Sequence, residues 1–358
     1  MKFFPGELCA FAGEDVSRKG AKFARENKGN LVKKALLKTI YNLGGFALFQ
    51  QTTRDKVLIL TYHRFSREKH PSKISGAEFS KHLAYLVKHH RVLSLTEAVD
   101  ALKNEEPLPP NAAVITIDDG CADAYEVAFP VLKQFNLPAT IYVVTDFLDG
   151  KCWLWTDLTR YILRNTKLDS LKIEFGGDDK IETKLADAVQ RTETANRINS
   201  RLKKLPDEAK ENKIKEIADN LKVGIPAAPV DEFKPISWEQ AREMDAGNVQ
   251  IESHTVTHPI LTNINGSRLD YELQTSRKRL EHKLEKEVRH FCYPNGSLND
   301  AVKAAVVTAG YASAVTTAYG FNESGANQFV LNRIDALAAI ENFAQSASGF
   351  EAFKQNIK

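Results

Sequence analysis

Two adjacent aspartates, Asp118 and Asp119, follow a short apolar run and precede Gly120. Adjacent side chains point in different directions, so one carboxylate can bind a metal ion while the other stays free as a base. Glycine at position 120 permits a tight exit from a strand. The simpler alternative is a helix N-terminus capped by Asp119. The position after an apolar strand favours chemistry here, whereas Asp178 and Asp179 form a second pair that we expect in a solvated loop.

Two histidines, His254 and His258, are four residues apart and directly follow another apolar run. On a helical turn this spacing places both rings on one face, where they can bind one ion at about 2.0–2.1 Å. A chance pair of surface or core histidines is the alternative, but Asp119 is available as a third ligand. Two imidazoles and one carboxylate leave a coordination position open for water, as in catalytic sites. We expect a divalent metal, zinc first, with cobalt, nickel or iron(II) as alternatives.

Short apolar runs alternate with helical patterns along most of the chain. Near-continuous apolar strands separated by helices indicate a parallel sheet covered on both faces. No glycine-rich phosphate fingerprint follows any run, so a barrel suits them better than an open dinucleotide-binding sheet. We predict an α/β fold, an irregular (β/α)7-type barrel, with its chemistry at the carboxyl ends of the strands. Strands are expected at 57–62, 113–117, 139–144, 249–252, 288–293, 312–316 and 329–334, and helices at 78–90, 122–135, 157–168, about 193–222, 238–246, 269–285 and 300–309.

Two segments fall outside this alternation. Residues of about 150–235 are charged, and we interpret them as a helical insertion that covers one side of the barrel mouth. Residues 31–49 have helical spacing with a basic, amphipathic character. They predict an N-terminal basic helical extension within a first domain, 1–55, before the barrel domain, 56–358. Peripheral contact of 31–49 with an anionic membrane is one hypothesis, and packing on the main domain or a partner is the other.

The composition excludes several classes of protein. The net charge is +3 and no Lys/Arg block is long, so we expect no nucleic-acid partner. Residues 1–56 hold eleven Lys/Arg and five Asp/Glu, hence +6, which leaves −3 for the remainder. No signal peptide or membrane-spanning segment is expected, which favours a cytoplasmic protein, with the inner membrane surface as a variant. The four cysteines form no CxxC pair, so free thiols are expected, with a disulfide as the alternative.

The order of the two motifs, Asp-Asp after a strand and then His-Thr-x-x-His-Pro, resembles the polysaccharide deacetylases, carbohydrate esterase family 4. The resemblance covers about residues 57–335 and is interrupted by the insertion. It implies that Asp118 is the catalytic base. It also implies that Asp119, His254 and His258 are the metal ligands.

The family's third motif, close to Arg-x-x-Pro-Tyr-Gly, falls on residues 291–296, which read Phe-Cys-Tyr-Pro-Asn-Gly. The resemblance implies that Tyr293 and the backbone N–H of Asn295 face the substrate and the oxyanion. Cys292 stands where the family often has the arginine that braces the base. The last motif, Leu-x-His, meets residues 331–333, Leu-Asn-Arg, so the usual general-acid histidine is missing.

Two residues could fill these gaps. Arg333 could orient Asp118 through a charge-assisted hydrogen bond. His63 follows the first strand, so it belongs at the same mouth as a possible proton donor; a hydrogen-bonded structural histidine is the alternative. Arg333 and Arg64 could equally be ion-pair residues at the barrel rim.

Together these features predict a metal-dependent carbohydrate N-deacetylase. The expected reaction is hydrolysis of an N-acetyl group on an amino sugar of a polysaccharide or glycolipid precursor, with release of acetate. The alternatives are a metal-containing carbohydrate-binding protein without turnover and a metal-dependent hydrolase of another amide or acyl bond. A spare carboxylate beside the metal, Asp118, argues against pure binding.

Overall fold

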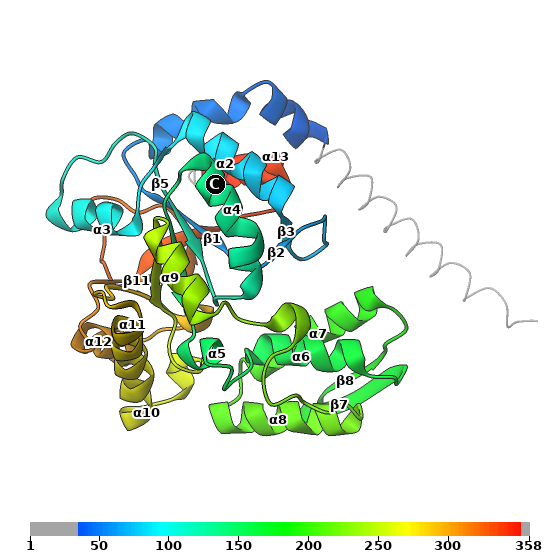
Figure 1. Cartoon of the computed structure of the whole chain (residues 1–358). Helices are drawn as coiled ribbons and strands as arrows, with labels where there is room; N and C mark the ends of the chain where they lie inside the picture. Colours follow the sequence, from blue (N-terminus) through cyan, green and yellow to red (C-terminus); the bar gives the residue numbers. More distant parts are fainter. Residues whose placement is uncertain (1–34, 352–358) are drawn as a thin grey trace, which may run out of the picture. The chain divides into compact units, whose positions relative to one another are not determined.

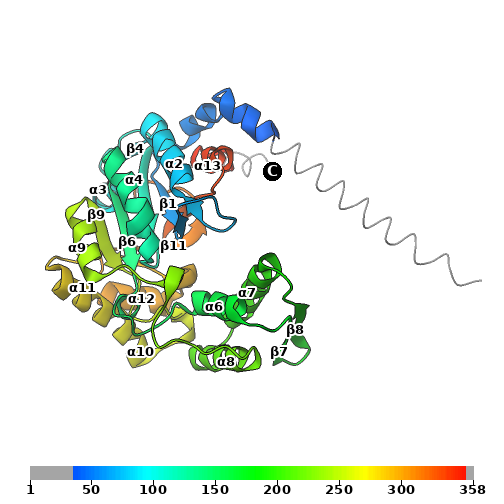
Figure 2. The same cartoon turned by 45° about the vertical axis from the view of Figure 1, so that its right-hand side comes forward.

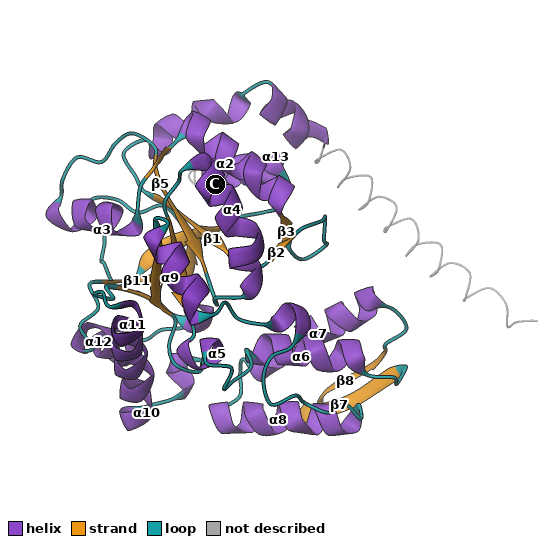
Figure 3. Ribbon diagram, viewed as in Figure 1, coloured by secondary structure: helices purple, strands orange, loops and turns teal. Residues whose placement is uncertain are grey.

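The computed structural model describes residues 35–351. They divide into two compact units, one from Thr53 to Ala338 and one that combines the described residues before Thr53 with those after Ala338. The larger unit contains a closed barrel of parallel strands with helices around it (Figures 1 and 3). The order around the barrel is β1-β12-β11-β10-β9-β6-β5, and β5 pairs with β1 to close it. The predicted (β/α)7-type barrel is therefore confirmed.

All seven predicted strands are present. Their bounds are β1 (Leu58–Tyr62), β5 (Ala112–Ile117), β6 (Ala139–Val143), β9 (Val249–Ser253), β10 (His290–Cys292), β11 (Ser313–Tyr319) and β12 (Leu331–Asp335). Three two-residue strands were not predicted: β2 (Phe65–Ser66) and β3 (Ile74–Ser75), which pair with each other, and β4 (Arg91–Val92), which pairs with β5. Two residues are too few to carry a periodic signal.

The helices around the barrel largely match the predicted ones. They are α2 (Gly76–His89), α3 (Leu95–Asn104), η2 (Ala124–Ala128), α4 (Phe129–Phe135), α5 (Thr145–Leu148), α9 (Trp238–Ala246), η4 (Leu261–Asn263), α10 (Gly266–Asp270), η5 (Tyr271–Thr275), α11 (Ser276–Leu284), η6 (Pro294–Gly296) and α12 (Asp300–Thr308). The helix expected at 269–285 begins at Gly266 and is interrupted by η5, which is π-helical. The helix expected at 122–135 likewise begins with a π-helical turn, η2.

The register of β1 and β5 positions the candidate catalytic residues that follow these two strands. Both strands are buried along their whole length, which their apolar residues allow. Tyr62 pairs with Ile117, and the backbone N–H of Asp118 donates to the carbonyl of Tyr62 at 2.9 Å. Because parallel strands end at the same rim, this register brings His63 and Asp118 to the barrel mouth together.

The insertion is a folded layer with a core of its own. It contains α6 (Trp155–Asn165), β7 (Ser170–Gly176), β8 (Asp179–Lys184), α7 (Ala188–Leu202), α8 (Asp207–Asn220) and η3 (Asp231–Phe233). Figure 2 shows α6, α7, α8 and the β7–β8 hairpin grouped on one side of the barrel. The prediction of a helical insertion missed the antiparallel hairpin of β7 and β8. The hairpin alternates buried and exposed residues, with Leu171, Ile173 and Ile181 packed into the insertion's core. Its many charged residues concealed this period of two.

The smaller unit contains a helix at residues 35–42, η1 (Gly45–Thr53) apart from its last residue, and α13 (Ile340–Ala347). The ring of Phe350 contacts Phe49, with centroids 4.9 Å apart. A continuous helix over 31–49 is wrong for the described part, because Gly44 has a φ of +70° and ends the first helix; residues 31–34 lie outside the described ones. The domains 1–55 and 56–358, the membrane contact and the cytoplasmic location stay predictions.

Within residues 35–351, every helix is too short or too polar to cross a bilayer. Cys121, Cys152 and Cys292 are free thiols, as expected, and Cys9 lies outside the described residues.

We expect Gly120→Ala to destabilise the barrel by about 2–4 kcal/mol, because two costs add. Gly120 has a φ of +79°, and an added Cβ would lie 2.9 Å from Cγ1 of Val143. The control is Gly177→Ala in the hairpin turn, where φ is +56° but nothing lies within 4 Å of the Cβ. Urea unfolding of both variants separates backbone strain from steric clash. Equal losses would contradict the clash.

Candidate metal centre

Three ligand-type side chains converge at the barrel mouth. Oδ1 of Asp119 lies 3.6 Å from Nε2 of His254 and 3.6 Å from Nε2 of His258. Two ligands at about 2.0–2.1 Å from one ion, at a tetrahedral angle, are about 3.3 Å apart. Burial and the nearby His254 lower the pKa of His258 to about 3, so its ring is neutral and able to bind a metal. The donor set and its spacing therefore fit one divalent ion.

The loop that carries the two histidines is not the helical turn that their spacing predicted. Thr255 has a φ of +76° and His258 a φ of +60°, so the chain turns through left-handed residues. Asp119 has a φ of +78°, and such conformations cost about 1–3 kcal/mol each in residues with a side chain. The rings still meet, with centroids 4.8 Å apart. Backbone strain of this kind clusters at functional sites.

A hydrogen bond determines which nitrogen of His254 faces the other ligands. Nδ1 of His254 lies 2.8 Å from the backbone carbonyl of Cys292. A carbonyl only accepts, so Nδ1 donates a proton to it and Nε2 faces the other ligands. Burial lowers the pKa of His254, but its hydrogen bonds and the neighbouring carboxylates of Asp119 and Asp118 outweigh burial and raise it, so a metal ion would displace the proton from Nε2. Nδ1 of His258, by contrast, is buried and has no hydrogen-bond partner among the described residues.

Asp118 faces a different partner from Asp119, as two adjacent carboxylates allow. Both of its oxygens accept from Arg333, Oδ1 from one terminal nitrogen and Oδ2 from the other, each at 2.7 Å. Burial raises the pKa of Asp118, but the charge and hydrogen bonds of Arg333 outweigh burial and lower it to about 2. Asp118 is therefore an ionised carboxylate held beside the ion position by a two-point ion pair.

Cys292, at the motif position where the family resemblance implies a bracing arginine, contacts both Asp118 and Arg333. Its Sγ lies 3.5 Å from Oδ2 of Asp118 and 3.2 Å from a terminal nitrogen of Arg333. Arg333 is further held by Thr116 Oγ1 at 3.0 Å and the Thr316 carbonyl at 2.8 Å. The arginine thus reaches the carboxylate from β12, while β10 supplies a small thiol. The contact of Cys292 with this pair was not predicted.

His63 lies at the mouth, where the first strand was expected to deliver it. Its Nε2 is 3.7 Å from Oδ2 of Asp118, and its side chain is 48% exposed. A half-exposed ring beside the carboxylate can exchange protons with solvent and with a bound molecule.

Tyr293 and Asn295 line the same cleft as the three ligands. The hydroxyl of Tyr293 donates to the carbonyl of Phe329 at 3.0 Å, which fixes its ring. Asn295 has a φ of +56°, and Gly296 packs so closely on Thr317 that an added Cβ would lie 2.0 Å from its Oγ1. The turn that presents the Asn295 backbone is therefore tightly constrained.

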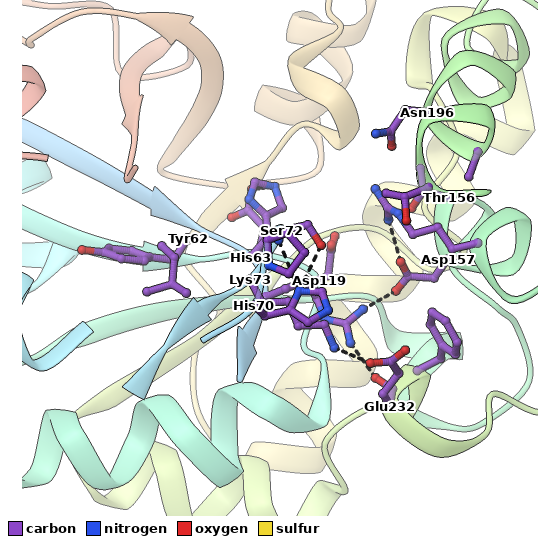
Figure 4. A pocket seen from close by; sticks show the side chains of 18 of the residues that line it. Tyr62, His63, His70, Ser72, Lys73, Asp119, Thr156, Asp157, Asn196 and Glu232 are labelled. Atoms are coloured by element: carbon purple, nitrogen blue, oxygen red, sulfur yellow. Dashed lines mark hydrogen bonds and ion pairs between the residues drawn. The ribbon is translucent and has the colours of Figure 1, made fainter. Parts of the chain in front are cut away.

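The cleft above the ligands has a volume of about 1250 Å³, and the insertion forms its second wall. Figure 4 shows His63 and Asp119 on the barrel side, and Thr156, Asp157 and Asn196 on helices of the insertion. The residues of the insertion that line the cleft were not predicted, because no motif or spacing marks them.

Arg64 fastens the insertion to the barrel. Its guanidinium donates to Asp123 at 2.7 Å, to Asp157 on α6 at 2.9 Å and to the carbonyl of Glu232 on η3 at 2.5 Å. Arg64 is thus the rim ion-pair residue that one alternative proposed. It directly follows His63, so the same strand end positions the histidine and the second wall of the cleft.

Comparison with known proteins finds related sequences. The family model described as polysaccharide deacetylase matches residues 105–314. The YxkH protein of Bacillus subtilis (strain 168) is 21% identical over 304 residues, which cover 85% of this chain and 77% of YxkH. The poly-beta-1,6-N-acetyl-D-glucosamine N-deacetylase of Staphylococcus epidermidis is 30% identical over 112 residues, covering 26% of this chain and 38% of that enzyme.

A solved structure has the same fold. The Streptococcus pyogenes deacetylase PplD, in complex with acetate, superposes with a TM-score of 0.56 at 19% identity. The superposition covers 83% of this chain and 99% of PplD.

In the metal-free protein we expect Arg333→Met to lower the free energy of unfolding by about 3–5 kcal/mol near pH 7, because it leaves a buried carboxylate unpaired. In the wild type the pKa of Asp118 lies below its unfolded value of about 3.9. Its contribution to stability is therefore present above about pH 4 and is lost as the pH falls toward about 2. In the variant, burial raises this pKa without the opposing effect of Arg333, so the deficit in the free energy of unfolding relative to the wild type shrinks as the pH falls.

Urea unfolding near pH 7 and near pH 4 measures this difference. The control is Arg289→Met, which removes a pair with the 42%-exposed Asp100 and should cost less than about 1 kcal/mol. An Arg333→Met deficit that is the same at both pH values would contradict the assigned role of the arginine.

Proposed function

The chain belongs to the polysaccharide deacetylase family, and on that basis we propose that it hydrolyses an N-acetyl group on an amino sugar, releasing acetate and a free amine. The observation that carries this proposal is the pairing of a three-ligand centre with one adjacent carboxylate, Asp118, that Arg333 binds through both oxygens. The substrate class we propose is an N-acetylated polysaccharide or glycolipid precursor. The S. epidermidis relative, whose name gives poly-beta-1,6-N-acetyl-D-glucosamine, supports this class.

The ion we propose is zinc, because imidazole and carboxylate ligands suit it, with cobalt, nickel or iron(II) as alternatives. Asp119, His254 and His258 would hold it. When bound, such an ion polarises the acetamide carbonyl and lowers the pKa of water toward about 7.

The remaining steps belong to this chain's own residues. Asp118, ionised and oriented by Arg333, takes a proton from the attacking water. The backbone N–H of Asn295 donates to the acetyl oxygen as that oxygen gains negative charge, an interaction worth about 3–4 kcal/mol. The ring of Tyr293 borders the cleft beside it. His63 delivers a proton to the leaving amine nitrogen, in place of the histidine absent from position 333.

We expect Asp118→Asn to lower acetate release by about 10²–10⁴-fold while zinc stays bound, because asparagine cannot take a proton. His254→Ala should lose both zinc and turnover. The assay is acetate release from oligosaccharides of β-1,6-linked N-acetylglucosamine, with zinc content measured on the same samples.

The matched control is Asp178→Asn in the exposed turn of the β7–β8 hairpin, the other Asp-Asp pair of the chain. It should keep the wild-type rate. If Asp118→Asn released acetate at the wild-type rate, Asp118 would not be the catalytic base. Zinc and glycan binding by the wild type without acetate release would favour a binding protein, and release of another acyl group alone would favour a different hydrolase.

We expect His63→Gln to lower the turnover number by about 10²–10⁴-fold with zinc content unchanged, because glutamine cannot donate the proton that the leaving amine needs. His70→Gln is the control, since His70 lines the cleft but is not among the proposed catalytic residues. It should change the rate less than about threefold, well below the range for a catalytic proton donor. Steady-state acetate release measures both, and full activity in His63→Gln would assign the proton donor elsewhere.

A further inference from the structure

Glu272 is a buried carboxylate that does not line the cleft but accepts hydrogen bonds from the loop between the two histidines. It belongs to the π-helical segment η5, and its side chain is 0% exposed. Oε2 accepts the backbone N–H groups of Val256 at 2.8 Å and Thr257 at 2.9 Å. Oε1 accepts the hydroxyl of Thr257 at 2.6 Å. One side chain therefore binds three donors of the segment that joins His254 to His258.

The gripped loop cannot keep its shape by local preference. Thr255 is β-branched and left-handed, a combination that is a conformational outlier. Its carbonyl and that of Val256 accept from the N–H groups of Thr145 at 3.1 Å and Asp146 at 2.9 Å. The loop is thus held by α5 through its carbonyls and by Glu272 through its N–H groups. Such backbone persists only where its surroundings over-determine it.

The two histidines depend on this loop to different degrees. His254 has a hydrogen bond of its own, from Nδ1 to the Cys292 carbonyl. His258 has no partner at Nδ1 among the described residues, and its backbone N–H donates to Oγ1 of Thr255 at 3.0 Å. The loop conformation therefore determines the position of the His258 ring more strongly than it determines the position of the His254 ring.

We propose that Glu272 is a positioning residue for the metal centre: by binding the N–H groups of Val256 and Thr257, it holds His258 at the distance from Asp119 that an ion requires. The proposal rests on the metal site of the proposed function. Residues behind metal ligands typically change affinity by about 10–100-fold when they are removed.

A carboxylate suits this task better than an amide. Arg268 donates to Oε1 of Glu272 at 2.8 Å and to Oγ1 of Thr257 at 2.9 Å, so every nearby partner of Oε1 is a donor. Glutamine keeps one oxygen for the two backbone N–H groups but turns an NH₂ group toward Arg268 and the Thr257 hydroxyl. The loss in Glu272→Gln should therefore be smaller than in Glu272→Ala, without being zero.

The experiment measures zinc affinity of the purified full chain by chelator competition and records the visible d–d spectrum of the cobalt-loaded protein. We expect the zinc Kd of Glu272→Ala to rise by about 10–100-fold and that of Glu272→Gln by about 3–10-fold, with a changed cobalt spectrum in both. The control is Glu281→Ala on α11, which removes a partner of Arg277 and of the Val288 N–H without touching the loop. Its Kd and spectrum should equal those of the wild type.

A folded Glu272→Ala with wild-type Kd and cobalt spectrum would reduce Glu272 to a structural residue and overturn the proposal. Should Glu272→Ala fail to fold, Glu272→Gln decides by the same two measurements. Failure of the wild type itself to bind zinc or cobalt would instead refute the metal site of the proposed function. Wild-type binding without acetate release would refute the reaction and leave the role of Glu272 standing.

Discussion

The ion pair between Asp118 and Arg333 is the interaction that lets two adjacent aspartates have different environments. Both carboxylate oxygens of Asp118 accept hydrogen bonds from the guanidinium, which fixes the orientation of this side chain beside the ligands. Asp119 follows in a left-handed conformation and turns its carboxylate toward the two histidines. A buried carboxylate without a counter-charge would be neutral or would destabilise the barrel. The arginine therefore supports both the fold and the proposed chemistry.

Arg333 reaches Asp118 from a strand that lies far from it in the sequence. All strand ends converge on one mouth, so a long side chain can reach the same carboxylate from more than one strand. Here the guanidinium comes from Arg333 on β12. Cys292 on β10 contacts both Asp118 and Arg333 without separating them. Arg64 at the rim also joins distant segments through its guanidinium. Its three acceptors come from the barrel and from two elements of the insertion.

Most of the barrel could be predicted because its signal is local. Each strand is a short apolar run, buried along β1, β5 and β6, and runs of this kind separated by helices indicate a parallel sheet. The predictions failed where the signal was short or diluted. The two-residue strand β4 has no period to detect, and the charges of the β7–β8 hairpin concealed its alternation. The π-helical turns η2 and η5 could not be predicted, because the search for helices assumed the α-helical period of 3.6 residues per turn.

The sequence by itself determined which residue types stand at the strand ends: the Asp118-Asp119 pair, the spacing of His254 and His258, and the arginine at position 333. The tertiary structure alone decided that the histidines meet through a left-handed loop, that Glu272 grips this loop, and that the insertion forms the second wall of the cleft. The physical reason is the separation in sequence between the residues that interact. Strand propensity and motif spacing are properties of neighbouring residues, whereas these contacts join segments whose proximity depends on closure of the barrel.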